Sequence, residues 1–210
     1  MRHTCHRAMP TPEPKMSQPA EKTFFDADAY LAWEAEQSGR HEYVHGEVFA
    51  MTGALEAHVT VALNVAMALR NHLRGGPCSV FISDMKLRVA ADNAFYYPDV
   101  FVTCADSDRA ENRYKSAPSL IVEVLSASTG AYDRGDKFAS YRKLPSLREY
   151  ALVNPERISV DLFRRDDQGR WVLHPFEPGQ TVELASVELR LPIEAIYEDV
   201  RFDPEASAHP

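Results

Sequence analysis

The sequence predicts an α/β domain built on a mixed β-sheet, and three observations support this prediction. Helix-like and strand-like segments alternate along the chain up to residue 145. Residues 120–125 form a nearly continuous apolar run, which is typical of a strand that is covered on both faces. Strand-like runs then dominate after Glu149. The length of 210 residues, with 45% apolar and 26% charged residues, suits one globular domain.

Three segments have helical patterns. Residues 27–37 follow Asp26, which suits the N-cap position because its carboxylate can accept a backbone N–H. Residues 55–73 carry apolar side chains near helical spacing, and two glycines and a proline end the pattern. Residues 133–144 form the third predicted helix, and Pro145 follows its end.

Strand-like runs account for most of the remaining sequence. Residues 42–44 and 47–49 are predicted to form a hairpin that turns at the His-Gly pair between them. The turn signal at 166–169 predicts a second hairpin. The polar stretch 105–117 reads as a loop or a short helix. The other predicted strands are 79–82, 85–89, 95–102, 120–125, 150–153, 158–164, 171–174 and 181–184.

The two ends of the chain are predicted to lie outside the folded domain. Residues 1–22 are rich in Pro, Ser, Thr and charge, so they cannot offset their ordering entropy by burying apolar side chains. They contain no apolar stretch of the kind that a secretory signal needs. We therefore predict a disordered tail over 1–22, a folded domain over 23–202 and a C-terminal tail over 203–210.

The charge balance and the cysteines narrow the class of protein. A net charge of -8, from 31 acidic and 23 basic residues, argues against binding nucleic acid by overall charge but leaves a local basic cleft open. Cys5, Cys78 and Cys104 are widely spaced and form no CxxC motif. This pattern argues against a disulfide framework and against a zinc site, and it is typical of a protein in a reducing cytoplasm. The apolar runs are too short to span a membrane.

Two carboxylates lie in runs where apolar residues are expected. Asp99 follows Pro98 in the run YYPDVFV, and Glu123 interrupts the run LIVEVL. Burying an unpaired carboxylate costs several kcal/mol in practice, so each one needs a compensating partner. A turn at Pro98 would explain Asp99 by itself, and a structural ion pair with an arginine would explain Glu123.

Lys137 and Tyr141 follow on a predicted helix, one turn apart and therefore on the same face. If the strands that carry Asp99 and Glu123 are neighbours, the two carboxylates can bind one cation. Mg²⁺ prefers oxygen ligands, typically one or two carboxylates with water and phosphate oxygens. A lysine beside such a site can orient the attacking water and offset phosphate charge. Lys137 alone would be a solvated helix residue, so the prediction depends on the combination.

The order of these motifs resembles a known family. Residues from about 24 to 200 are similar to the bacterial restriction endonucleases of the Uma type, which belong to the PD-(D/E)xK nuclease superfamily. The matching stretches are HEYVHGEVFAM, EAHVTVALNVAMALRNHL, FISDMKLRV, YYPDVFVTC, LIVEVLSAST and DRGDKFASYRKLPSLREYALVNP. The resemblance implies a restriction-endonuclease-like mixed β-sheet core, flanked by helices, with added β-hairpins at the C-terminal end.

The resemblance also assigns residues to the PD-(D/E)xK motif. The aspartate of PD falls on Asp99, and the acidic residue of (D/E)xK falls on Glu123. The usual lysine position, two residues further on, is Leu125 in this sequence. This departure resembles branches of the superfamily in which the lysine has moved to the following helix, where the matching residue is Lys137.

Three further residues match less central parts of the family pattern. Tyr141 matches the tyrosine that follows the displaced lysine, and it would orient that lysine or touch phosphate. Glu42 matches a glutamate of the first hairpin, and Asp84 an aspartate of the SDM stretch; either would complete the metal shell. Glu42 could instead be a strand-edge acid, and Asp84 could cap a turn. A structural role is the favoured interpretation of His58, on the helix 55–73.

These inferences predict a divalent-metal-dependent endonuclease that hydrolyses DNA, with Mg²⁺ or Mn²⁺ as the cofactor. One alternative is a nucleic-acid-binding or regulatory module on a nuclease fold. Such a module would cut nucleic acid weakly or not at all. Another is an enzyme that acts on RNA or a nucleotide. The hairpins after Tyr150 are expected to provide a homodimer surface, because the alternation in 158–162 leaves one apolar face to be covered.

Overall fold

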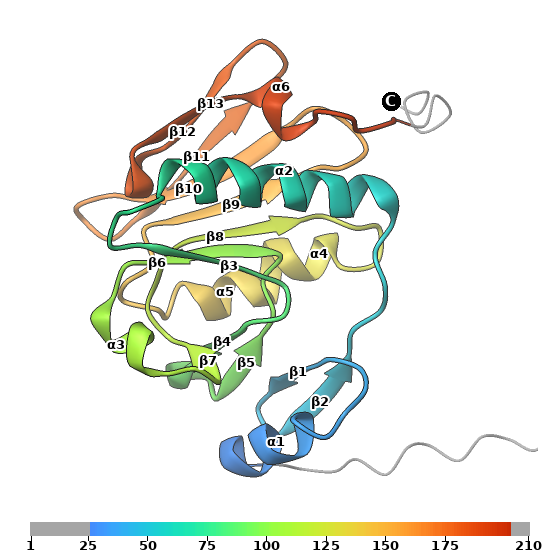
Figure 1. Ribbon diagram of the computed structural model, residues 1–210, viewed down its shortest axis with the longest axis vertical. Coiled ribbons are helices and arrows are strands. Elements are labelled where there is room, and N and C mark those ends of the chain that lie inside the picture. Colours follow the sequence, from blue (N-terminus) through green and yellow to red (C-terminus); the bar gives the residue numbers. More distant parts are fainter. Residues whose placement is uncertain (1–25, 203–210) are drawn as a thin grey trace, which may run out of the picture.

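A mixed six-stranded β-sheet forms the centre of the computed structural model, which describes residues 26–202 (Figure 1). β8 and β9 run parallel and all other neighbours run antiparallel, which confirms the predicted mixed sheet. The predicted tails at 1–22 and 203–210 lie outside the described residues. In spatial order the strands are β11 (Trp171–Phe176), β10 (Val160–Arg165), β9 (Glu149–Val153), β8 (Pro118–Val124), β6 (Val100–Thr103) and β3 (Ser79–Ile82).

Two smaller sheets complete the β-structure. The first contains the predicted N-terminal hairpin, which turns at His45 and Gly46, both with positive φ. The second is a C-terminal pair, so that the added hairpins of the predicted fold are present. The first consists of β2 (Glu47–Ala50), β1 (His41–Val44), β5 (Ala94–Tyr96), β4 (Lys86–Val89) and β7 (Tyr114–Lys115), and the second of β12 (Thr181–Leu184) and β13 (Leu189–Pro192).

Helices cover both faces of β8 (Figure 1). Val122 and Val124 of β8 share one core with α2 (Glu56–His72), and Ile121 shares another with the helical segment after β8. That segment consists of α4 (Gly130–Tyr132), the π-helical turn η2 (Asp133–Lys137) and α5 (Phe138–Tyr141). The prediction of a doubly covered strand at 120–125 is therefore confirmed. Glu123 alternates with Val122, so its side chain lies on the η2 side.

The remaining helices are short. α1 (Ala27–Glu34) begins at Asp26, whose carboxylate accepts the Ala29 N–H at 2.7 Å, so the predicted N-cap is confirmed. α3 (Asp106–Ala110) lies in the stretch for which the sequence left a loop or a short helix open, and α6 (Ile193–Ile196) follows β13. No helix within residues 26–202 is long and apolar enough to cross a lipid bilayer.

The predicted single strand at 95–102 is wrong, because the chain forms two strands that belong to different sheets. β5 ends at Tyr96 and β6 begins at Val100. Pro98 lies between them, and a proline has no N–H to donate to a sheet ladder. The chain therefore leaves the five-stranded sheet and enters the six-stranded sheet within three residues, and Asp99 is the last residue before β6.

The prediction for the cysteines is also wrong, because Cys78 and Cys104 form a disulfide bond. Cys78 directly precedes β3 and Cys104 directly follows β6, and Ser79 lies opposite Thr103 in that antiparallel pair. Sequence spacing gave no sign of this bond, because strand register brings the two cysteines together. The inference of a reducing cytoplasm from unpaired cysteines loses its basis, and a cytoplasmic location stays a prediction.

Replacing both bonded cysteines with serine should lower the free energy of unfolding by about 3.5 kcal/mol, the loop-closure entropy of a loop with a sequence separation of 26. Urea denaturation of Cys78→Ser/Cys104→Ser and of the wild type measures this difference. Cys5→Ser keeps the bonded pair and serves as the matched control. A non-reducing peptide map in which both cysteines react freely with an alkylating reagent would contradict the bond.

Candidate active site

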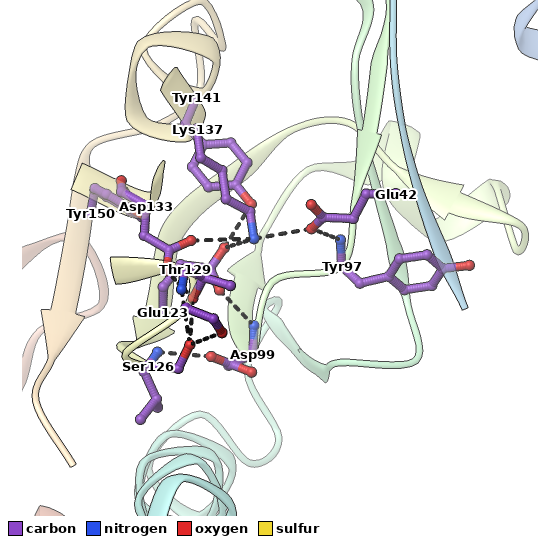
Figure 2. A network of polar contacts seen from close by, with 12 residues as sticks. Glu42, Tyr97, Asp99, Glu123, Ser126, Thr129, Asp133, Lys137, Tyr141 and Tyr150 are labelled. Carbon is purple, nitrogen blue, oxygen red and sulfur yellow. Dashed lines mark hydrogen bonds and ion pairs between the residues drawn. The ribbon is translucent and has the colours of Figure 1, made fainter. Parts of the chain in front are cut away.

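Asp99, directly before β6, lies opposite Glu123 of the neighbouring antiparallel strand β8. Val100 of β6 pairs with Val122 of β8, and this register places Asp99 across from Glu123. The Asp99 N–H donates to Glu123 Oε2 at 3.2 Å, and the Val124 N–H donates to Asp99 Oδ2 at 2.8 Å (Figure 2). The structure therefore brings together the two carboxylates that the sequence predicted to share one site.

Lys137 projects from the π-helical turn η2 into the same site. Its Nζ lies 3.0 Å from Glu123 Oε1, 3.0 Å from Glu42 Oε1 and 3.7 Å from Asp133 Oδ1 (Figure 2). Its side chain is only 8% exposed, so the ammonium group is surrounded by protein rather than by water. The predicted helix lysine thus reaches the carboxylates. Such π-turns occur frequently at functional sites.

Tyr141 holds Glu123 rather than facing solvent. Its hydroxyl group donates to Glu123 Oε1 at 2.8 Å, and the residue is fully buried. Burial and the adjacent carboxylate of Glu123 raise the pKa of Tyr141 well above its ordinary value, so the hydroxyl remains a donor. Full burial does not suit contact with phosphate. Tyr141 fixes the acid that the lysine also contacts, and its role in orienting the lysine stays a prediction.

The structure places Glu42 beside Lys137 and Asp84 on the protein surface. Glu42 lies on β1, and its Oε1 contacts Lys137 and accepts the Tyr97 N–H at 3.4 Å. Glu42 therefore holds Lys137 in place. Within residues 26–202, no hydrogen bond or ion pair joins Glu42 to Asp99. Asp84 is 71% exposed and forms an ion pair with Arg40 at 2.6 Å. The structure does not bring Asp84 to the site, and we remove it from the candidate metal ligands.

Two site residues were missed by the sequence analysis. His58 Nε2 lies 2.9 Å from Asp99 Oδ1, although the sequence favoured a merely structural role for this histidine. Asp133 is buried beside Lys137, and its Oδ2 accepts the Thr129 hydroxyl at 2.7 Å. Asp133 could have been found from its position four residues before Lys137 on one helix face. His58 could have been found from its place among the sheet-facing positions of α2.

Comparison with known proteins identifies the family. Residues 27–194 match the Uma2 family model, which is described as "Putative restriction endonuclease". The chain belongs to the Uma2 family. One relative, an uncharacterized protein of Synechocystis sp. PCC 6803, is 37% identical over 175 residues, covering 83% of this chain and 92% of the relative. A second uncharacterized protein of that organism is 31% identical over 149 residues, covering 70% and 84%.

A solved structure shares the fold of this Uma2 chain. It is the crystal structure of a "putative nuclease belonging to DUF820" from Anabaena variabilis, and it superposes with a TM-score of 0.69 at 16% sequence identity. The superposition covers 83% of this chain and 98% of that chain. At this identity the likeness shows the fold alone. It confirms the restriction-endonuclease-like arrangement that the sequence predicted.

The Uma2 site contains more buried acid than its lysine neutralises. Burial raises the pKa of Glu123; Lys137 opposes this effect, and the neighbouring carboxylates, Asp99 first, add to it. Burial lowers the pKa of Lys137, but the carboxylates of Glu123, Glu42 and Asp133 outweigh it and raise that pKa well above its ordinary value. The ammonium therefore stays charged, whereas the raised pKa of Glu123, about 8, favours its protonated form near neutral pH, so that its ionised form needs a further cation.

The donor set of Asp99 and Glu123 fits a divalent cation. Both side chains offer oxygen, and Mg²⁺ is commonly held by one or two carboxylates, with water and substrate phosphate completing its shell. Within residues 26–202 no group of three or more His, Cys, Asp and Glu side chains is arranged as a ready-made metal cage. Two carboxylates with solvent and substrate are therefore the arrangement that this site can provide.

Proposed function

We propose that this Uma2 chain is a divalent-metal-dependent endonuclease that hydrolyses phosphodiester bonds in DNA. The family and the fold support a nuclease. The observation that carries the finer proposal is the juxtaposition of Asp99, Glu123 and Lys137, with 3.0 Å between the ammonium group and Glu123. Two carboxylates beside a buried lysine are suited to holding a cation and stabilising a phosphoryl group that gains negative charge.

Asp99 and Glu123 would hold Mg²⁺ or Mn²⁺ in this proposal. When bound, the ion supplies Lewis-acid stabilisation of charge on the phosphate oxygens. Asp99 is the more accessible of the two acids, with an 18% exposed side chain against 4% for Glu123, so substrate approaches from the Asp99 side. His58 and the Val124 N–H each engage one oxygen of Asp99 and fix its carboxylate in place.

Lys137 stabilises charge and positions water rather than acting as a general base. Its three acidic neighbours keep it protonated, so it has no lone pair with which to take a proton. Its ammonium can donate hydrogen bonds to the attacking water and to a phosphate oxygen. Glu42 and Glu123 contact the ammonium from β1 and β8, so the donor is oriented before substrate binds.

Cleavage of supercoiled plasmid DNA by the purified full chain tests the proposal. We expect nicked or linear product with Mg²⁺ or Mn²⁺, none with EDTA, and a loss of at least about 100-fold in rate for Glu123→Gln. Asp84→Asn removes an exposed acid outside the site and should cut at the wild-type rate. Metal-independent cleavage, or an unchanged rate in Glu123→Gln, would contradict the proposal.

The non-cutting alternative rests on two observations: Leu125 occupies the usual lysine position, and the net charge of the chain is -8. A plasmid that is bound but never cut, with a wild-type protein that is folded by circular dichroism, would favour this module over the enzyme. Cleavage of single-stranded RNA but not of DNA would keep the site and change the substrate. The same protein preparation and the same metals serve both assays.

A further inference from the structure

The solvent-facing side of α2 is apolar, although the opposite side of this helix is already buried. Val61, Val65 and Leu69 pack against the six-stranded sheet. The C-terminal part of the chain also contacts α2, since the Asn64 side chain donates to the carbonyl oxygens of Ile196 and Glu198. A helix with apolar residues around most of its circumference is typical of a buried helix, yet within residues 26–202 one apolar row of α2 stays exposed. We name the exposed apolar residues the α2 stripe: Leu55, Val59, Leu63 and Met67, with exposed fractions of 84%, 54%, 55% and 53%.

The apolar surface continues from α2 to β3, which runs alongside it (Figure 1). A groove of about 510 Å³ is lined by Met67 of the helix and by Val80 and Ile82 of the strand. β3 is an edge strand and contains neither proline nor charge, the features that usually protect such edges from pairing. β11, at the opposite edge of the same sheet, contains Pro175 and is protected in this way.

The α2 stripe is complementary to a second copy of itself. Two α2 helices that cross antiparallel on a two-fold axis at Leu63 place this residue against its own copy. The positions four residues to either side of it are Val59 and Met67, which are both apolar. The positions seven residues to either side are Glu56 and Arg70, which have opposite charges and are both exposed. An isologous interface requires such a reciprocal match.

We propose that a second copy of this chain docks on the α2 stripe and forms a two-fold symmetric dimer. Nucleic acid does not suit this surface, because binding phosphate requires several lysines or arginines. Among the residues of the α2 stripe and of the groove lining, Arg70 is the one basic side chain. The proposal is independent of the nuclease activity proposed above. It concerns residues that the candidate active site does not use.

The hairpins after Tyr150, where the sequence analysis expected the dimer surface, do not offer the expected apolar face. Val160 and Leu162 of β10 are 1% and 0% exposed. They belong to the same core as Val182 and Leu184 of β12, so the chain covers this face by itself. The sequence-based reason for placing the dimer there is therefore removed, and the α2 stripe takes its place.

The mass of the purified full chain in solution tests the proposal, measured by sedimentation velocity over a range of micromolar concentrations. We expect the wild type at twice the chain mass, and Leu63→Glu should raise the dimer dissociation constant by at least about 30-fold, as the loss of a central interface residue does. Leu173→Glu places the same charge at a 47% exposed leucine of β11 and should remain a dimer. Circular dichroism and thermal melting confirm that each variant is folded.

A charge-swap series tests the predicted register. Glu56→Arg and Arg70→Glu should each weaken the dimer, and the double variant should restore it, because the opposite charges then face each other again. In a Cys5→Ser background, Leu63→Cys should cross-link to its own copy and Leu173→Cys should not. A wild type that stays at the chain mass at every concentration overturns the proposal. A dimer that survives Leu63→Glu, or that Leu173→Glu abolishes, also overturns it.

Discussion

Replacing Lys137 with methionine should lower the free energy of unfolding by about 3–5 kcal/mol, the typical cost of removing one partner from a buried ion pair. The Lys137 side chain is 8% exposed, and its ammonium group lies 3.0 Å from Glu42 Oε1 and from Glu123 Oε1. Without it, these carboxylates keep their burial and lose their counter-charge. A domain of this kind has a total stability of only about 5–15 kcal/mol. Cleavage of plasmid DNA should be lost at the same time.

Urea denaturation and plasmid cleavage of the same preparations separate the two roles of Lys137. Lys143→Met is the matched control, because its ion pair with Asp92 involves a 46% exposed lysine and should cost less than about 1 kcal/mol. Adding Glu42→Gln to Lys137→Met removes one uncompensated acid, so part of the stability should return while cleavage stays absent. A Lys137→Met protein with wild-type stability and wild-type cleavage would show that the lysine is dispensable.

Mn²⁺ should raise the melting temperature of the wild type by several degrees, and Asp99→Asn and Glu123→Gln should each abolish this rise. A ligand that binds only the folded state stabilises it by about 2.7 kcal/mol at 100 times its dissociation constant. The excess of buried acid over Lys137 is the structural reason to expect such a cation. Differential scanning calorimetry with and without Mn²⁺ measures the shift, and it does not depend on catalysis.

Two further variants show whether this rise comes from the candidate site. Asp84→Asn should keep the full rise, because Asp84 is exposed and paired with Arg40. His58→Ala should need roughly 10–100 times more Mn²⁺ for the same rise, the usual effect of removing a group that orients a metal ligand. His58→Gln retains an N–H donor and should recover part of that loss. An unchanged Mn²⁺ response in Glu123→Gln would place the cation elsewhere.

The central pair of the site could be predicted from the sequence because each acid stands in an apolar run. Asp99 and Glu123 violate the pattern of a buried strand, and the structure places them across one pair of strands. Lys137 could be predicted only in combination with these two acids and through the family resemblance, since a lone helix lysine carries no signal. The strand pattern also sufficed for the central sheet, whose β8 is covered on both faces as its continuous apolar run implies.

The features that the sequence could not predict depend on contacts between distant segments. The residue pattern of 95–102 is typical of one continuous strand. Only the arrangement of the two sheets shows that Pro98 divides this segment into two strands. The pairing of Cys78 with Cys104 depends on register between β3 and β6. His58 and Asp99 belong to separate elements, so the polar contact that links them becomes visible only when α2 is packed on the sheet.

The contacts of Lys137 also have a consequence for the order of events during folding. The lysine joins Glu42 of the five-stranded sheet to Glu123 of the six-stranded sheet, so the site exists only after both sheets have docked. Contacts between residues so far apart in sequence form slowly, because a long loop must close first. A chain still emerging from the ribosome has the N-terminal hairpin long before it has this lysine. Under the nuclease activity proposed above, newly made protein is therefore expected to leave DNA uncut until synthesis has passed η2 and the fold has closed.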